Sequence, residues 1–145
     1  MIPADIERVP DCMFFFLAKA YQKSHGLIKQ QLKPYGLTNL QHLVLEGLWL
    51  QPGVTAAELG KLLILDKATL SGVLDRMVEA GWVERRRAAS DRRALKIYPA
   101  PKAEKIKDEL IRLRQDANDR LMARFSLEER LLFRRLLMDL FMDDQ

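Results

Sequence analysis

Cysteine is almost absent from this chain, because Cys12 is the only one among 145 residues. A single thiol can form neither an internal disulfide nor a thiolate metal cage, and such usage is typical of a reducing, cytoplasmic setting. Histidine is nearly as rare, and His25 and His42 stand far apart, without the paired spacing of a metal site. We therefore expect no bound metal and no disulfide framework.

Long apolar runs are also missing. No stretch approaches the roughly 20 residues that a membrane helix needs, and residues 1–7 lack the basic segment and apolar core of a signal peptide. The sequence contains no phosphate-binding glycine loop, no nucleophile elbow and no metal-spaced cluster. These gaps predict a protein that is neither secreted nor inserted in a membrane, that is not an enzyme and that needs no cofactor.

What the chain does have is an excess of positive charge in one place. The formal net charge is +4 and the isoelectric point is about 9.3, and much of the excess lies between Arg85 and Lys96. Clustered positive charge favours a polyanionic partner over general solubility. The length suits one domain, residues 1–145, with a core of its own.

Apolar residues recur at helical spacing in six segments, most of which start or stop at recognisable signals. Thr55 and Ser126 each open a capping box, in which a hydroxyl accepts from a free amide at the start of a helix. Thr38 and Asp66 are further N-cap residues. The predicted helices are Asp11–Lys33, a helix from Thr38 to the pair Pro52-Gly53, a short one that starts at Thr55, Asp66–Ala80, a long helix after Pro101 that reaches Phe125, and one from Ser126 to about Phe141.

Two strands follow the fourth predicted helix. Trp82–Arg87 and Ala94–Tyr98 are predicted to pair as a hairpin around the polar tip Ala88–Arg93, and Pro99 and Pro101 are expected to end the sheet. With a tight turn between the third and fourth helices, this order is that of a winged helix-turn-helix, mainly α with a small β-hairpin wing. The arrangement predicts binding to duplex DNA.

The fourth predicted helix suits the major groove of DNA. At about 100° per residue its outward face is small or polar, so the helix can approach base edges closely. Lys67, Thr69 and Ser71 are the expected groove contacts, and Arg76 is expected to hold a phosphate. An ordinary amphipathic surface helix would show the same face, and only the neighbouring wing favours DNA.

Arginine dominates the predicted wing. Arg85 and Arg87 alternate with Arg86 along a strand, so only some of them can face DNA. Arg92 and Arg93 at the tip carry permanent charge and suit a narrow minor groove. Each cation that neutralises a phosphate is expected to add about 0.9 to the slope of log affinity against log salt.

These features resemble the MarR family of bacterial transcription regulators, and the likeness covers nearly the whole chain. Its most specific parts are the Leu-Asp-Arg-Met run at 74–77, the glycine Gly81 at the end of that helix, and the Asp-x-Arg wing at 91–93. The resemblance implies a homodimer whose terminal helical regions, 1–36 and 102–145, intertwine beside a DNA-binding lobe at 37–100.

The resemblance also implies roles for particular residues. In the family the wing aspartate braces the arginine two residues on, which enters the minor groove, and the matching positions are Asp91 and Arg93. Family positions that read the major groove fall on Thr69, Ser71 and Gly72. This chain departs from the family at Gly72, where many relatives carry arginine.

Members of the family commonly respond to small phenolic or anionic effectors in a cleft between the dimer helices and the DNA-binding lobe, or to oxidation of a cysteine in the first helix. The candidate ligand-binding residues here are Tyr21, His25, His42 and Trp49, for which core or surface roles are the alternative. Cys12 is the redox candidate. It lies a couple of residues before the family's sensing position, which favours an inert, half-buried thiol.

The combined hypothesis is a sequence-specific, ligand-responsive homodimeric repressor that binds a pseudo-palindromic operator in double-stranded DNA. The alternative is a non-regulatory nucleic-acid-binding module, either architectural or RNA-binding, that uses the same basic wing. Indifference to duplex sequence, or a preference for RNA in competition, would favour the alternative.

Overall fold

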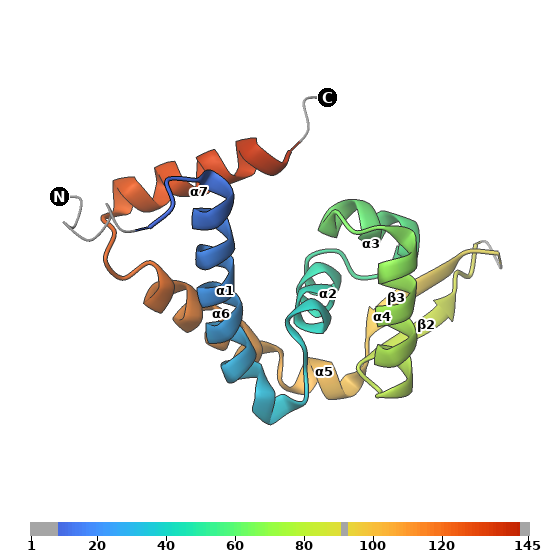
Figure 1. Cartoon of the computed structure of the whole chain (residues 1–145). Helices are drawn as coiled ribbons and strands as arrows, with labels where there is room; N and C mark the ends of the chain where they lie inside the picture. Colours follow the sequence, from blue (N-terminus) through green and yellow to red (C-terminus); the bar gives the residue numbers. More distant parts are fainter. Residues whose placement is uncertain (1–8, 91–92, 143–145) are drawn as a thin grey trace.

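The computed structural model describes residues 9–90 and 93–142 of the chain. The described part is mainly helical and contains one three-stranded antiparallel sheet. Figure 1 shows helices α1 (Met13–Leu32), α6 (Lys107–Leu121) and α7 (Leu127–Phe141) on one side. A lobe of helices α2 (Asn39–Leu50), α3 (Ala56–Leu63) and α4 (Lys67–Glu79) lies with the sheet on the other side. The predicted fold class, mainly α with a small β-hairpin wing, is confirmed. None of the described helices is long and apolar enough to cross a membrane.

Helix α1 spans Met13–Leu32 and carries a large exposed apolar surface. Leu32 is its only fully buried residue, whereas 66% of Met13 and 85% of Phe14 is exposed. A short 3₁₀ turn, η2 (Lys33–Tyr35), ends the helix and leads into a left-handed glycine. The apolar residues of α1 therefore have few partners among the described residues.

The lobe contains three helices that begin at the predicted caps. Helix α2 spans Asn39–Leu50, α3 spans Ala56–Leu63 and α4 spans Lys67–Glu79. The hydroxyls of Thr38 and Thr55 accept from the third helical amide at 3.1 and 3.2 Å, and both capping boxes are complete. Such caps fix where each helix starts, because they satisfy amides that have no partner inside the helix.

The sheet has one strand more than the sequence predicted. Strands β2 (Val83–Arg87) and β3 (Leu95–Pro99) form the predicted hairpin, with Arg85 opposite Ile97. Strand β1 (Val54–Thr55) pairs with the other edge of β3, which gives the order β1-β3-β2. Two residues are too few to show an alternating pattern, so no sequence signal marked β1.

Proline ends the sheet as predicted, with the last strand reaching one residue further than expected. Pro99 is the last residue of β3, where it lies opposite Val83. Pro101 is the first residue of helix α5 (Pro101–Lys105). This position suits proline, because the first helical residue needs no amide hydrogen.

The predicted long helix after Pro101 is two helices. Helix α5 ends at Lys105, because the next residue, Ile106, has a φ of −109° and a ψ of 10°, which lie outside the helical region. Helix α6 then spans Lys107–Leu121. It stops four residues before Phe125, where the prediction ended. Helix α7 (Leu127–Phe141) follows the predicted capping box at Ser126.

One hydrophobic core fills the lobe and reaches the base of the terminal helices. Leu48, Leu59 and Met77 lie at its centre and are completely buried. The same cluster continues to Leu32 of α1 and Leu110 of α6, which are also fully buried. The C-terminal end of α1 and the N-terminal end of α6 are therefore packed against the lobe. Helix α7, in contrast, has no fully buried residue.

Candidate nucleic-acid interface

The turn between α3 and α4 sets the direction of α4. Ile64 caps α3 in the left-handed region at φ 53°, and the amide of Leu65 donates to the carbonyl of Gly60 at 2.9 Å. A β-branched residue is rare in that region because its side chain crowds the backbone. The two helices thus form the compact helix-turn-helix that the sequence predicted.

The side chain of Asp66 holds the start of α4. Its Oδ1 accepts from the Thr69 amide at 2.8 Å, and its Oδ2 accepts from the Thr69 hydroxyl at 2.6 Å. The hydrogen bond from the Thr69 hydroxyl has the larger effect, and the one from the Thr69 amide comes next. Both hold the pKa of Asp66 below its usual value, because they stabilise the carboxylate. Thr69, a predicted groove contact, therefore has its hydroxyl hydrogen committed to Asp66 and presents its oxygen as an acceptor.

The outer face of α4 is exposed as predicted. Lys67, Thr69, Ser71 and Arg76 are exposed, whereas the opposite face is buried in the core. A Cβ at Gly72 would stand 3.7 Å from Nη1 of Arg76, an ordinary contact distance. The Arg76 guanidinium thus lies over Gly72 on the small face of the helix.

An ion pair joins α4 to the wing. Nη2 of Arg85 on β2 lies 2.6 Å from Oδ1 of Asp75 on α4, with 33% and 63% of the two side chains exposed. Arg85 is one of the DNA contacts that the sequence predicts. The pair neutralises Asp75 and holds the helix against the strand, a connection that the sequence did not indicate.

The other wing arginines have distinct surroundings. Nη2 of Arg86 lies 2.7 Å from Glu84, and its guanidinium carbon lies 4.6 Å from the centre of the Tyr98 ring. Arg86 and Arg85 thus have different partners, in keeping with the predicted alternation. Arg87 and Arg93 are exposed. Asp91 and Arg92 lie outside the described residues, so the predicted brace from Asp91 to Arg93 stays a prediction.

Lys102 of α5 supports the end of α4, a contact that the sequence does not predict. Its Nζ lies 3.0 Å from the carbonyl oxygen of Ala80 and 4.0 Å from the centre of the Trp82 ring. A cation at the end of a helix satisfies carbonyls that have no partner in the helix. The contact spans 22 residues of sequence, and no local pattern reports it.

The four candidate ligand-binding residues are spread over two helices. The rings of Tyr21 and His25 on α1 lie 5.5 Å apart. On α2, His42 is 1% exposed, and the Nε1 of Trp49 is buried without a hydrogen-bond partner in the described chain. A surface pocket at residues 25–39 is lined by His25 but by none of the other three.

Polar side chains connect the lobe to α6 beside this region. Nε2 of His42 lies 3.1 Å from Oε1 of Glu46, an ion-pair distance without hydrogen-bond alignment, and Oε2 of Glu46 lies 3.1 Å from Nη1 of Arg114. The Tyr35 hydroxyl donates to the Glu109 carboxylate, and this hydrogen bond, with burial and the negative charge, raises the pKa of Tyr35.

Cys12 immediately precedes α1 and is exposed, so the thiol is not half-buried as expected. No group of three or more histidine, cysteine or acidic side chains with a metal-binding arrangement occurs among the described residues. Neither observation tests whether Cys12 senses oxidants.

The fold and the interface define a winged helix-turn-helix protein. A family model described as the MarR family matches residues 35–94. YsmB of Bacillus subtilis, an uncharacterised HTH-type transcriptional regulator, is 30% identical over 144 residues, which cover 97% of this chain and 95% of YsmB.

Solved structures agree with this class. A variant of MarR from Escherichia coli in complex with operator DNA has a TM-score of 0.82 and 26% identity, over 96% of this chain and 99% of that one. BpsR of Bordetella bronchiseptica, whose DNA binding is regulated by 6-hydroxynicotinic acid, has a TM-score of 0.85 over 92% of this chain and 96% of that one, and its 22% identity shows a shared fold. The chain belongs to the MarR family of transcriptional regulators.

Proposed function

We propose that this protein is a transcriptional regulator that binds a pseudo-palindromic operator in double-stranded DNA as a homodimer. One observation carries the proposal: the exposed polar face of α4 lies beside an arginine-rich strand and is joined to it by the Asp75–Arg85 ion pair. A variant of MarR from E. coli, which has the same fold, has been solved in complex with operator DNA. An architectural or RNA-binding role finds no comparable support.

Each element of the interface has a separate part in the proposal. Lys67, Thr69 and Ser71 contact base edges in the major groove, where exposed small and polar side chains allow close approach. Arg76 contacts a phosphate, and Arg93 reaches the minor groove beside it. The start of α4 thereby reads sequence, and the wing adds affinity that depends on salt.

The dimer follows from apolar surface that the chain leaves exposed. Eight apolar side chains along α7 are each 40 to 67% exposed, and apolar side chains that a lone chain would leave in water usually mark an interface. We assign dimerisation to regions 1–36 and 102–145, and DNA binding to 37–100, within one domain. The apolar residues of α7 exposed in this way include Leu127, Leu131, Leu132, Phe133, Leu136, Met138, Leu140 and Phe141.

A small phenolic or anionic effector completes the proposal. Nδ1 of His42 and Nε1 of Trp49 are buried and have no hydrogen-bond partner in the described chain. Buried polar atoms of this kind cost free energy unless water or a ligand satisfies them. An aromatic acid beside α2 could accept from Trp49 while its ring packs on apolar walls. Such an acid would change the affinity of the protein for DNA if it bound one of two dimer conformations more tightly than the other.

The decisive experiment is selection of duplexes from a random pool by the purified protein. We expect enrichment of a site with two half-sites about 34 Å apart, which matches one turn of DNA. Arg93→Ala should reduce affinity for every sequence, whereas Ser71→Ala should alter which bases are selected. An unenriched pool, or stronger binding to RNA of the same length, would favour the architectural or RNA-binding alternative. Binding to chromosomal DNA also implies a cytoplasmic location.

The effector is tested by titration with simple aromatic acids such as hydroxybenzoate. Trp49 is partly buried against the core and beside the proposed site, so binding should change tryptophan fluorescence and weaken the operator complex together. Trp49→Phe should remove most of the fluorescence change that binding causes. If these acids leave both the operator affinity and the tryptophan fluorescence unchanged, the proposed effector site beside Trp49 is wrong.

A further inference from the structure

A hydrogen-bonded pair at the start of α4 bears on which bases the protein selects. The hydroxyl oxygen of Thr69 lies 2.6 Å from Oδ2 of Asp66, and the Thr69 amide nitrogen lies 2.8 Å from Oδ1 of the same carboxylate. Asp66 and Thr69 are both exposed. The pair therefore lies on the surface that is proposed to meet DNA, where a base edge can reach it.

The chemistry of the two groups fixes which of them donates. An ionised carboxylate has no hydrogen and can only accept, whereas a hydroxyl has one hydrogen and two lone pairs. The hydrogen bonds from Thr69 hold the pKa of Asp66 below its usual value, so the carboxylate is ionised at neutral pH. The only hydroxyl hydrogen of Thr69 therefore points at Asp66, and lone pairs alone remain for another partner.

This polarity persists when a base approaches, because the competing hydrogen bond is weaker. A hydrogen bond to an ionised acceptor is roughly twice as strong as one between neutral groups. The carbonyl of a base is neutral, so it competes poorly with Asp66 for the hydroxyl hydrogen. The bond from the Thr69 amide to Oδ1 also orients the carboxylate and keeps the acceptor in place.

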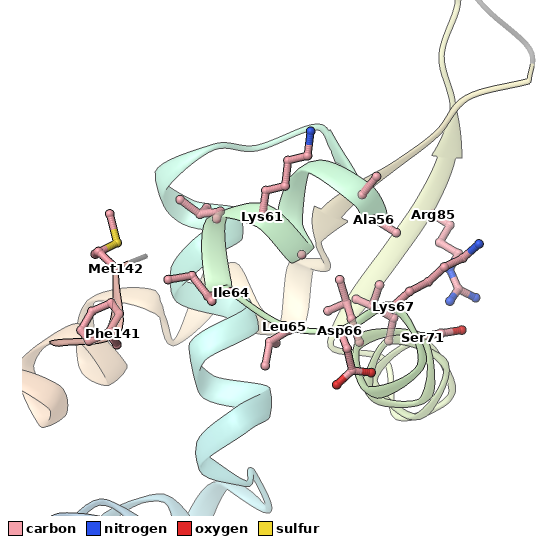
Figure 2. A pocket seen from close by; sticks show the side chains of 15 residues that line it. Ala56, Lys61, Ile64, Leu65, Asp66, Lys67, Ser71, Arg85, Phe141 and Met142 are labelled. Carbon is pink, nitrogen blue, oxygen red and sulfur yellow. The ribbon is translucent and has the colours of Figure 1, made fainter. Parts of the chain in front are cut away.

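Ser71, two residues further along α4, has no such restriction. It lies on an open groove, and Figure 2 shows Phe141 and Met142 facing Ile64 across that groove. The Ser71 hydroxyl makes no hydrogen bond with any residue that the structure describes. It can donate to a base carbonyl or accept from a base amine, so its contact does not by itself choose between them.

The four bases differ in the groups that they present in the major groove. Adenine presents the N6 amine and cytosine presents the N4 amine, and both of these groups donate. Thymine presents O4, and guanine presents O6 and N7, all of which accept. A hydroxyl that has only lone pairs available can form a hydrogen bond with adenine or cytosine and with neither of the other two.

We propose that Asp66 makes Thr69 a reader that only accepts hydrogen bonds, so that each operator half-site has adenine or cytosine at the position that Thr69 contacts. Asp66 is a positioning residue in this specificity, because it sets the choice of base through the hydroxyl of Thr69. The specificity rests on the proposed function, in which Thr69 contacts a base edge, and it identifies the exocyclic amine as the group that is recognised.

The first experiment compares selections from a random pool of duplexes by wild type, Thr69→Val and Thr69→Ser. Valine keeps the branched shape without the hydroxyl, and serine keeps the hydroxyl. The position that Thr69 contacts is the one at which Thr69→Val loses the base preference. There, the wild type and Thr69→Ser should both enrich adenine or cytosine. Enrichment of thymine or guanine by the wild type, or a selection that Thr69→Val leaves unchanged at every position, would overturn the proposal.

Asp66→Asn tests the positioning role. Asparagine is an equally good cap, because its oxygen accepts from the Thr69 amide. Its nitrogen donates to the Thr69 oxygen and leaves the hydroxyl hydrogen free for a base carbonyl. The preference for adenine or cytosine over thymine or guanine should therefore fall about threefold to tenfold at this position alone.

The control variant is Asp116→Asn, which removes the same charge from an exposed position on α6. It should keep the base preference of the wild type at every position. An Asp66→Asn protein that folds and binds duplex DNA but keeps the wild-type preference would show that Asp66 does not set the choice of base.

Base analogues identify the group that Thr69 contacts. Purine in place of adenine, or 2-pyrimidinone in place of cytosine, removes the exocyclic amine from one half-site of the selected operator. The resulting loss of affinity should be about threefold to tenfold larger for the wild type than for Thr69→Val. Equal losses would mean that another side chain, such as that of Asp66 itself, contacts the amine, and they would contradict the proposal.

Failure of this specificity differs from failure of the proposed function. A protein that binds no duplex in any selection would overturn both. A protein that selects an operator with two half-sites, but whose base preference does not respond to Asp66→Asn or Thr69→Val, would overturn the specificity alone.

Discussion

The Asp75–Arg85 ion pair gives the sharpest prediction about the interface. The Asp75–Arg85 pair as a whole has no net charge that could neutralise a phosphate. Arg85 should therefore release no counterion on DNA binding. Its part is then to hold α4 against β2. We therefore expect Arg85→Ala to weaken the operator complex while leaving the salt dependence of binding unchanged.

The size of the interaction follows from its exposure. The contact is short, at 2.6 Å, but 33% of Arg85 and 63% of Asp75 is exposed, so water screens the attraction. Exposed pairs of this kind couple by about 0.2–1 kcal/mol. A double-mutant cycle of Asp75→Asn and Arg85→Ala, measured by urea unfolding, should give a coupling free energy in that range.

The salt dependence of operator affinity distinguishes an arginine that holds α4 against β2 from an arginine that contacts a phosphate. Operator affinity is measured at several salt concentrations for the wild type, Arg85→Ala, Asp75→Asn and Arg93→Ala. Asp75→Asn frees the guanidinium and should steepen the slope of log affinity against log salt by up to about 0.9, whereas Arg93→Ala should reduce it by about 0.9. A reduction of that size in Arg85→Ala would refute the reasoning, because it would mean that Arg85 leaves Asp75 to contact a phosphate.

Three further outcomes are expected. Gly53→Ala should lower the free energy of unfolding by about 1 kcal/mol more than Gly81→Ala, because both have positive φ but only at Gly53 would a Cβ meet the Tyr98 ring, at 2.9 Å from its oxygen; equal losses would exclude the clash. The pKa of Asp66 is lowered, so its cap stabilises fully above its usual value of 3.8 and is lost as pH falls through the lower folded value. The difference in urea midpoint between wild type and Asp66→Ala should therefore shrink only in strong acid, and a difference that shrinks near neutral pH would contradict this. Leu131→Asp should raise the dimer dissociation constant at least tenfold, since it puts a charge in apolar surface; sedimentation that still shows dimers at the same concentrations would argue against α7 as the interface.

Much of the fold could be predicted because its signals are local. The caps at Thr38, Thr55, Asp66 and Ser126 are all present, and the hydrogen bonds that they make reach only three residues along the chain. Helical and strand spacing is equally local, so the order of elements and the winged helix-turn-helix followed from it. The two-residue strand β1 and the break at Ile106 were missed, since neither leaves a periodic signal.

The site was only partly predictable for the same reason. The sequence located the basic wing and the polar face of α4, since charge and periodicity are visible in one segment. It did not show that Arg85 pairs with Asp75 or that Lys102 caps the carbonyl of Ala80. These contacts join side chains from different elements, and their geometry depends on how α4 lies against β2 and α5.

The sequence by itself determined the elements, their order, the family likeness and the chemistry available to the surface, because each is set within a few neighbouring residues. Only the tertiary structure decided which charged side chains form ion pairs within the molecule. Arg85 is paired, whereas Lys61 and Lys67 make no ion pair with a described residue. It also decided that the end of α7 lies across a groove from Ile64. Packing brings distant segments together, and the electrostatic field at one site is the sum over all of them.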